Sequence, residues 1–317
     1  MTVAGILNVN KPKGWSSFDV VALVRRLVRE AVRHGGRFRV GHAGTLDPAA
    51  EGVLPVCIGQ ATRIIEYLIE EPKTYRARVR LGTSTDTYDA WGTVTRTGDP
   101  SSVTRDQAEQ ALSAFVGEIW QVPPMYSALK RDGVPLYRYA RAGLEVERQP
   151  RRVVVGRVEL LAFEPPLLDI EVECGRGAYI RTLAHDLGER LGCGAHLENL
   201  LRTGIGHFRL EEAVTPDLLR RSFKEGQWPD LLWAPDAALL NWPAAIMGER
   251  NERLSRMGRA LDLPLTPAAR QRGLARGVGC RAYSLAGHLV AVLRYEGQGG
   301  LWRPEKVFAA VDDSEGG

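Results

Sequence analysis

The 317-residue sequence contains no apolar run that approaches the roughly 18–20 residues needed to cross a bilayer. Its first residues also make a poor secretion signal, because the charged segment Lys11-Pro12-Lys13 interrupts them at once. Apolar residues make up 44% of the chain and charged residues 25%, which is ordinary for a globular protein and argues against disorder or coiled coil. We therefore expect a soluble cytoplasmic protein.

Cysteine is scarce, and the sequence contains no Cys-x-x-Cys pair. The four residues are Cys57, Cys174, Cys193 and Cys280. This scatter predicts reduced thiols in a reducing compartment. Cys193-Gly-Ala-His196 is the one Cys/His cluster, and without a second pair it is a weak zinc signal, so we expect no metal site.

Several common catalytic motifs are missing. There is no Gly-x4-Gly-Lys-Ser/Thr phosphate loop, no Gly-x-Gly-x-x-Gly after a strand pattern and no His-Glu-x-x-His zinc motif. A Gly-x-Ser-x-Gly nucleophile elbow is absent too. The usual signals for nucleotide hydrolysis, hydride transfer and serine-esterase chemistry are therefore lacking, and we expect no cofactor.

Lysine is rare among the cations, since 36 of the 42 basic residues are Arg and 6 are Lys. Arginine presents a planar fork that suits phosphates and stacks on bases. Residues 1–47 carry 8 basic and 3 acidic residues, or +5, while the whole chain is +4. A basic N-terminal face would favour nucleic acid as a partner. A GC-rich genome would also favour Arg over Lys, so composition leaves both explanations open.

The hydrophobic patterns predict strands and helices without regular βαβ alternation, which is typical of an α+β domain with a mixed sheet. A helix is expected after the Ser16-x-x-Asp19 capping pattern, and another after Thr104-x-x-Gln107. Further helices are expected over 61–68, after 177 and after 215. The clearest strands are expected over 5–10, 73–82, 153–163 and 168–174.

The pattern changes near Asn241-Trp242-Pro243, and we place a domain boundary there. Residues 1–242 would form the main domain, and 243–317 a small β-rich module with one charged helix and short strands. Residues 123–152 are rich in Pro, Gly, Tyr and basic residues and predict a long insertion with one short helix. Long structured insertions in compact domains are often functional.

Asp47 is the strongest candidate for chemistry. It lies in a glycine-punctuated loop, and glycines at 41, 44 and 52 would let the backbone approach a ligand closely. A carboxylate of ordinary pKa is ionised at neutral pH and needs no activating partner to act as a nucleophile or base. Alternatively, Asp47 followed by Pro48 is a good helix N-cap. Local sequence alone leaves both open.

The same loop, Gly41-His42-Ala43-Gly44-Thr45-Leu46-Asp47-Pro48, resembles the signature segment of the TruB family of bacterial tRNA pseudouridine synthases. Other segments resemble that family in the same order, and together they cover roughly residues 5–215. They are Leu7 to Gly14, Gly52 to Arg63, Lys73-Thr-Tyr75 with Leu81 to Asp89, Pro123 to Lys130, Gly177 to Leu183 and Leu187 to His196.

The resemblance implies roles for individual residues. Asp47 matches the family's catalytic aspartate, and Arg181 matches the arginine paired with it. Tyr75 matches the tyrosine that stacks on the target uracil, and Tyr179 matches a second pocket tyrosine. On local sequence alone Tyr75 could be a core residue, Tyr179 a packing residue and Arg181 an exposed helix charge.

Two further matches and three departures complete the comparison with the family. Leu200 matches an apolar pocket wall, and His42 matches a residue that contacts RNA near the flipped nucleotide. Without the resemblance they read as a core leucine and a loop histidine. The family commonly has Lys where Arg63 stands and Leu-Arg-Arg-Thr at 200–203, and Trp15 is atypical.

The chemistry implied by the resemblance makes these residue types sensible. Converting uridine to pseudouridine breaks the N-glycosidic bond, turns the base over and rejoins it through carbon. A base stacked in a T-loop must first be extruded, at a cost of a few kcal/mol. A tyrosine face returns about 1–3 kcal/mol by stacking, and an arginine beside Asp47 would keep its carboxylate charged and oriented.

The resemblance implies a pseudouridine-synthase fold, with a mixed, mainly antiparallel sheet crossed by the active-site cleft. The 123–152 insertion would close over RNA, and the C-terminal module would be an RNA-binding module of the PUA type. The expected partner is the T-arm of tRNA, with uridine 55 as the target, no guide RNA, no membrane and a monomeric enzyme. Alternatives are a non-catalytic RNA-binding protein, a hydrolase with Glu51 or Asp86 as second carboxylate, and a guide-RNA-dependent relative of the same fold.

Overall fold

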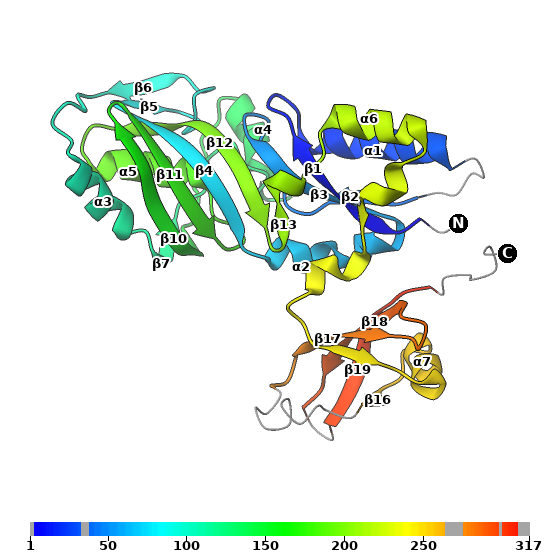
Figure 1. Cartoon of the computed structure of the whole chain (residues 1–317). Coiled ribbons are helices and arrows are strands. Elements are labelled where there is room, and N and C mark those ends of the chain that lie inside the picture. Colours follow the sequence, from blue (N-terminus) through cyan, green and yellow to red (C-terminus); the bar gives the residue numbers. More distant parts are fainter. Residues whose placement is uncertain (1–2, 33–37, 264–274, 298–299, 310–317) are drawn as a thin grey trace.

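The computed structural model describes residues 3–32, 38–263, 275–297 and 300–309. The larger sheet of this described chain has ten strands (Figure 1). They are β1 (Gly5–Lys11), β2 (Val40–His42), β3 (Glu51–Ile58), β4 (Lys73–Leu81), β7 (Gly117–Gln121), β10 (Arg151–Glu164), β11 (Leu167–Cys174), β12 (Ala195–Ile205), β13 (Phe208–Arg209) and β14 (Leu232–Trp233).

The order along this sheet is β14-β1-β3-β12-β4-β11-β10-β7, with β2 on β3 and β13 on β12. Among the described strands of this sheet, only β3 and β12 pair in parallel, and the other pairings are antiparallel. The expected mixed, mainly antiparallel sheet is confirmed. The parallel pairing covers just Leu201↔Glu51 and Arg202↔Gly52. The two halves of the sheet therefore meet at a short junction in its middle.

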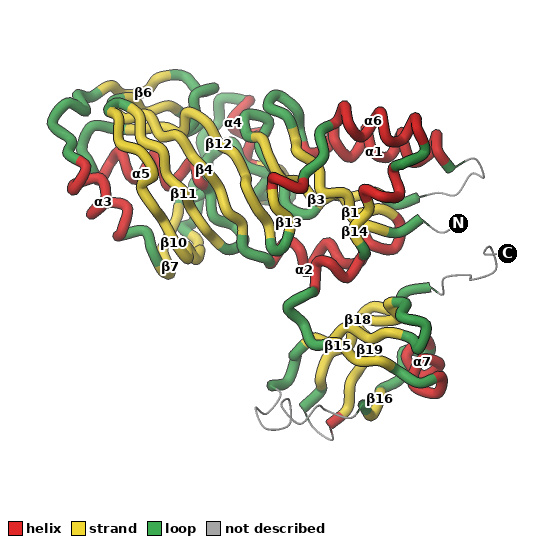
Figure 2. Tube along the Cα trace, in the orientation of Figure 1, coloured by secondary structure: helices red, strands yellow, loops and turns green. Residues whose placement is uncertain are grey.

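Helices cover the two halves separately, with α1 beside α6 at one end and α3 and α5 at the other (Figure 2). Their hydrophobic faces fill two core clusters, one around α1 and β3 and one around α5 and β4. The helices are α1 (Ser17–Ala31), α2 (Ile65–Glu70), α3 (Arg105–Ser113), α4 (Leu136–Arg141), α5 (Ile180–Arg190), α6 (Pro216–Glu225) and α7 (Glu249–Arg256). Short 3-10 helices are η1 (Gly59–Ile64), η2 (Leu210–Glu212), η3 (Trp228–Leu231) and η4 (Pro235–Leu239). Two hairpins are β5 (Thr83–Thr85) with β6 (Val94–Thr97), and β8 (Lys130–Arg131) with β9 (Val134–Pro135).

Local sequence signals account for several of these boundaries. Both expected capping boxes are present, with Ser16 and Asp19 at the start of α1 and Thr104 and Gln107 at the start of α3. The helix expected over 61–68 is wrong in detail, because a 3-10 helix occupies 59–64 and the α-helix begins only at Ile65. The insertion contains the expected short helix, α4.

The described residues from 244 onward form a second sheet of five strands, in the order β15-β17-β18-β19-β16. The strands are β15 (Ala244–Ile246), β16 (Leu261–Asp262), β17 (Gly279–Tyr283), β18 (Leu289–Tyr295) and β19 (Leu301–Val307). Residues 264–274, 298–299 and 310–317 of the expected module lie outside the described residues.

This second sheet lies against η1 and α2 of the larger unit (Figure 1). Arg63 donates a hydrogen bond to the carbonyl of Val307, and Lys306 forms a 2.5 Å ion pair with Glu66. The guanidinium of Arg294 lies 4.6 Å from the ring centre of Trp242. Arg63 therefore links η1 to strand β19 of the second sheet. Within the described ranges, no helix combines the length and apolar character needed to cross a membrane.

Candidate active site

A cleft of about 290 Å³ opens where the two halves of the large sheet meet. It is bounded by the loop before β3, the start of β4, the first turn of α5 and strand β12. Gly52 makes the junction possible: its φ is +106°, and a Cβ there would lie 2.2 Å from the carbonyl oxygen of Arg202. The side-chain lining includes Asp47, Lys73, Tyr75, Ser127, Tyr179, Arg181, Leu200 and Arg202.

Asp47 lies in a turn at this cleft, with its side chain 41% exposed. The backbone N–H of Ala50 donates to its carbonyl, 3.0 Å away, and residues 48–50 form no helix. The alternative that Asp47 caps a helix is therefore wrong. Its neighbours are fixed from α1 and the preceding loop. The buried hydroxyl of Ser17 bonds both the N–H (2.8 Å) and the C=O (3.1 Å) of Leu46, and the Gly14 N–H donates to Pro48 C=O.

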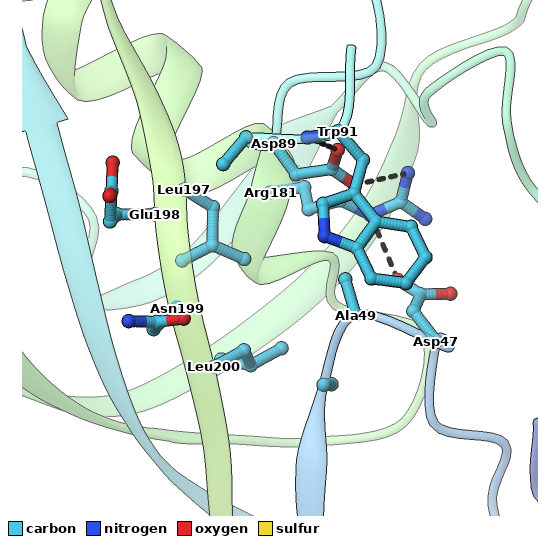
Figure 3. Close-up of a pocket in the computed structure, with 11 residues that line it drawn as sticks. Asp47, Ala49, Asp89, Trp91, Arg181, Leu197, Glu198, Asn199 and Leu200 are labelled. Atoms are coloured by element: carbon cyan, nitrogen blue, oxygen red, sulfur yellow. Dashed lines mark hydrogen bonds and ion pairs between the residues drawn. The ribbon is translucent and has the colours of Figure 1, made fainter. Parts of the chain in front are cut away.

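Arg181 points at Asp47 from the first turn of α5 (Figure 3). Its Nε lies 2.9 Å from Asp47 Oδ2, and its side chain is only 5% exposed, so it is not a solvated helix charge. The other guanidinium nitrogens donate to the carbonyls of Thr87 (3.3 Å) and Tyr126 (2.9 Å). The ion pair with Asp47 and the hydrogen bonds to two other chain segments hold the guanidinium plane in one orientation.

A second carboxylate, Asp89, faces the same guanidinium, with Oδ2 3.8 Å from an Arg181 nitrogen. Its other oxygen accepts hydrogen bonds from the hydroxyl of Thr87 (2.6 Å) and the backbone N–H of Trp91 (3.0 Å). One guanidinium against two carboxylates leaves a formal charge of minus one. Asp89 is buried and Asp47 is partly exposed, so Asp47 is the carboxylate of this group that a ligand in the cleft can reach.

The apolar walls of the cleft come from Tyr75, Tyr179 and Leu200. Tyr75 is also buried in the core cluster of that half of the sheet, so it belongs both to the core and to the lining of the cleft. Burial raises the pKa of the Tyr75 and Tyr179 hydroxyls above their ordinary value, so both rings are neutral. Gln121 holds Tyr179 in place by bonding its backbone N–H (3.0 Å) and C=O (3.3 Å).

His42 is the exception among the expected site residues, because it does not line this cleft. It lies on β2, two residues before the lining residue Gly44, and its Nδ1 is buried without a hydrogen-bond partner among the described residues. Burial, with the nearby Arg202 guanidinium, lowers the pKa of His42 below its ordinary value. The imidazole is therefore neutral at physiological pH. The described residues contain no group of three or more His, Cys, Asp or Glu placed to hold a metal.

Comparisons with known proteins agree with this architecture. Residues 29–180 match the model of the TruB family pseudouridylate synthase N-terminal domain, and 181–232 match the tRNA pseudouridylate synthase B C-terminal domain. A protein named tRNA pseudouridine synthase B from Dehalococcoides mccartyi is 42% identical over 304 residues, 96% of each chain. One of the same name from Ralstonia nicotianae is 44% identical over 310 residues, 96% of this chain and 94% of the relative. The chain belongs to the TruB family.

The fold comparison extends over both sheets. A chain from the crystal structure of a Cbf5-Nop10-Gar1 complex is similar with a TM-score of 0.72 and 27% identity, covering 96% of this chain and 85% of that chain. As a TruB-family pseudouridine synthase, the protein is an isomerase, and its cleft is the candidate active site.

Lys73 and Arg202 line the cleft and were missed as site residues by sequence reasoning. Arg202 is fully buried at the β3–β12 junction, where it donates to the carbonyls of Val53 (2.7 Å) and Gly44 (3.0 Å). Lys73 is buried beside Tyr75 and donates to the carbonyls of Ile69 and Glu71. The motif 73–75 signalled this region, but nothing in it assigned a role to the lysine.

Burial lowers the pKa of Lys73 from 10.5 to about 8. The folded state therefore disfavours the protonated amine, a cost that is full below pH 8 and disappears as the pH rises toward 10.5. We expect the free energy of unfolding of the wild type, relative to Lys73→Met, to rise by about 2–3 kcal/mol over that range, since one pKa unit is worth about 1.4 kcal/mol. Urea unfolding at pH 7 to 10 measures this, with exposed Lys224→Met as the control. A difference in unfolding free energy between wild type and Lys73→Met that does not change with pH would contradict the lowered pKa of Lys73.

The Ser17 hydroxyl is expected to stabilise the loop that carries Asp47. Ser17→Ala leaves the buried N–H and C=O of Leu46 without partners, and should lower the free energy of unfolding by about 1–3 kcal/mol. Chemical denaturation checks this, together with the rate of product formation, which should fall because the Asp47 backbone is released. Ser113→Ala, at an exposed hydroxyl on α3, should change stability by less than about 0.5 kcal/mol. Equal effects of both variants would refute the role of Ser17.

Proposed function

We propose that this TruB-family enzyme converts uridine to pseudouridine in tRNA, at position 55 of the T-loop, with Asp47 as the catalytic carboxylate. The single observation that carries the proposal is the Asp47–Arg181 pair at an open cleft with two neutral tyrosines. The names of the curated relatives, tRNA pseudouridine synthase B, support the tRNA substrate. The resemblance of the 41–48 segment supports the T-loop target and the role of Asp47.

The cleft contains the groups that the proposed reaction needs, namely a carboxylate with a positioning arginine and apolar walls for the base. The N1–C1′ bond breaks, the uracil turns over, a C5–C1′ bond forms, and the proton on C5 is replaced by one on N1, so no atom is gained or lost overall. The flipped uracil would lie against Tyr75, with Tyr179 and Leu200 as further walls. Asp47 would act on the ribose or the base, while Arg181 holds its carboxylate in position. Because the isomerisation is redox-neutral and transfers no group to or from the RNA, it needs no external oxidant, reductant or group donor.

Two further parts of the chain belong to the proposal as RNA contacts. The 123–152 insertion lies beside the cleft through Ser127, which lines it, and Tyr126, whose carbonyl accepts from Arg181. This insertion would close over the T-arm. Residues 243–317, including the second sheet, would form the RNA-binding module of the PUA type.

Incubating the purified chain with a bare T-arm RNA or tRNA transcript tests the function. We expect pseudouridine at position 55, no free uracil and no need for a guide RNA. A transcript with cytidine at position 55 is the matched control and should give no product. Affinity should fall steeply as salt rises, because phosphate contacts release counterions.

The competing functions give different results in the same assay. Release of free uracil would indicate a hydrolase, and product only after a guide RNA is added would indicate a guide-dependent enzyme. Binding without any change to the uridine would indicate a non-catalytic RNA-binding protein. Each of these outcomes overturns the proposal.

A further inference from the structure

Trp91 presents a large aromatic side chain to solvent at the edge of the candidate active site. The residue is 59% exposed, and it lines a small second cavity together with Asp47, Arg181 and Leu200 (Figure 3). The indole has no ring-stacking or cation–π partner among the described residues. An exposed indole at such a place offers a face that a flat ligand can cover.

The turn that carries Trp91 is tightly fixed. The Trp91 N–H donates to Asp89 Oδ1 (3.0 Å), and the N–H of Ala90 donates to the carbonyl of Leu197 on β12 (3.0 Å). Gly92 closes the turn, since a Cβ there would lie 2.3 Å from the Thr87 hydroxyl oxygen. The carboxylate that faces Arg181 thus also positions the Trp91 backbone, and the indole is displayed from a rigid base.

The space around the indole limits where a ligand can lie. The cavity behind it holds only about 10 Å³, about the room for a single water molecule, so a base does not fit between Trp91 and the Asp47–Arg181 pair. A ligand must instead cover the exposed surface. Lys13 lies at another part of the rim of this cavity, with Nζ 2.5 Å from Oδ1 of Asn199, which also lines it. An aromatic face with an ammonium group nearby matches the base and phosphate of one nucleotide.

We propose that Trp91 is the stacking platform for the base of a nucleotide that flanks the target uridine, with Lys13 beside its phosphate. This inference rests on the proposed function, because it places the flanking nucleotide next to the uridine in the cleft. Every base has a face that stacks on an aromatic ring, so the platform contributes affinity and register with little dependence on base identity. Removing a stacking aromatic costs about 1–3 kcal/mol, which corresponds to roughly 5- to 150-fold in affinity.

Steady-state kinetics on T-arm RNA test the platform. Trp91→Ala should raise KM about tenfold or more with kcat nearly unchanged, and Trp91→Phe should recover most of the loss because it keeps an aromatic face. Trp120→Ala is the matched control. Trp120 is another exposed tryptophan, 66% exposed on edge strand β7, and its replacement should leave KM unchanged.

Abasic RNA substrates identify the partner base. Each nucleotide near the target is replaced in turn by an abasic residue and assayed with wild type and Trp91→Ala. At the nucleotide that stacks on Trp91, removing the base should raise the KM of the wild type but not that of Trp91→Ala. Additive losses at every position, or an unchanged KM for Trp91→Ala, would overturn the inference. A fall in kcat alone for Trp91→Ala that Trp91→Phe does not restore would also overturn it. That result would mean that Trp91 shields the Asp47–Arg181 ion pair from solvent.

The same assay separates this inference from the proposed function. Product formation by the wild type tests the function. If the wild type is active and Trp91→Ala has the same KM, only the stacking platform is rejected, and the proposed function stands.

Discussion

Asp47→Asn is expected to abolish pseudouridine formation while leaving the fold and the RNA affinity nearly intact. The amide has almost the size and shape of the carboxylate, and its oxygen can still face the Arg181 guanidinium 2.9 Å away. It has no negative charge, however, and is neither an effective nucleophile nor a base. In the proposed function Asp47 takes part in the bond changes, so removing its carboxylate should lower the rate by at least about 10³-fold.

The measurement is single-turnover conversion of T-arm RNA, with the dissociation constant determined on the same RNA. Asp169→Asn is a suitable control, because Asp169 also pairs with an arginine, Arg78, at 2.7 Å, but on the outer face of the sheet. That variant should keep full activity. An active Asp47→Asn variant would assign the chemistry to another group, and an inactive variant that also failed to bind RNA would point to a folding defect.

Local signals in the sequence predicted the elements whose stability is decided locally. The α1 capping box, the strand expected over 73–82 and the short strands of the C-terminal module all appear as expected. Asp47 was found because its motif is contiguous. The family resemblance then identified its partners Tyr75 and Arg181, which lie far from Asp47 in the sequence.

Strand β12 was missed although it is central to the sheet. Its residues Ala195, His196 and Leu197 are buried in succession, so the two-residue period that marks a half-exposed strand is absent. Its pairing with β4 is also irregular, with register shifts near Asn199 and Gly204. This segment becomes a strand because the assembled sheet buries it, and local sequence propensity does not encode that burial.

The deeper parts of the site were missed for a related reason. Arg202 bonds Val53 across 149 residues of sequence, and Arg181 bonds Thr87 across 94. Asp89 was noticed as the end of the segment Leu81 to Asp89, but its contact with Arg181 exists only after β5 and α5 have packed against β12. Such contacts are properties of the assembled sheet, and a single sequence contains no local trace of them.

Arg181→Lys is expected to lower the single-turnover rate by about 10²-fold or more while RNA affinity changes little. Lysine keeps the positive charge but concentrates it on one nitrogen at the end of a flexible stem. The guanidinium of Arg181 serves four partners in different directions, the carboxylates of Asp47 and Asp89 and the carbonyls of Thr87 and Tyr126. One ammonium group cannot reach all of them. The Asp47 carboxylate then loses its fixed orientation, which matters most when bonds to the ribose or base change.

A stability measurement decides whether this loss is more than general damage to the site. Leaving one or two buried partners unsatisfied should cost about 1–3 kcal/mol of unfolding free energy, which still leaves the variant folded at 25 °C if the wild type has ordinary stability. Arg78→Lys, at an exposed bidentate pair with Asp169, should change neither rate nor stability appreciably. A rate that falls while affinity holds and the chain remains folded makes Arg181 a positioning residue for Asp47. A folded Arg181→Lys variant with wild-type rate would mean that Asp47 needs no fixed partner, and the Asp47–Arg181 pair could then no longer support the proposed function.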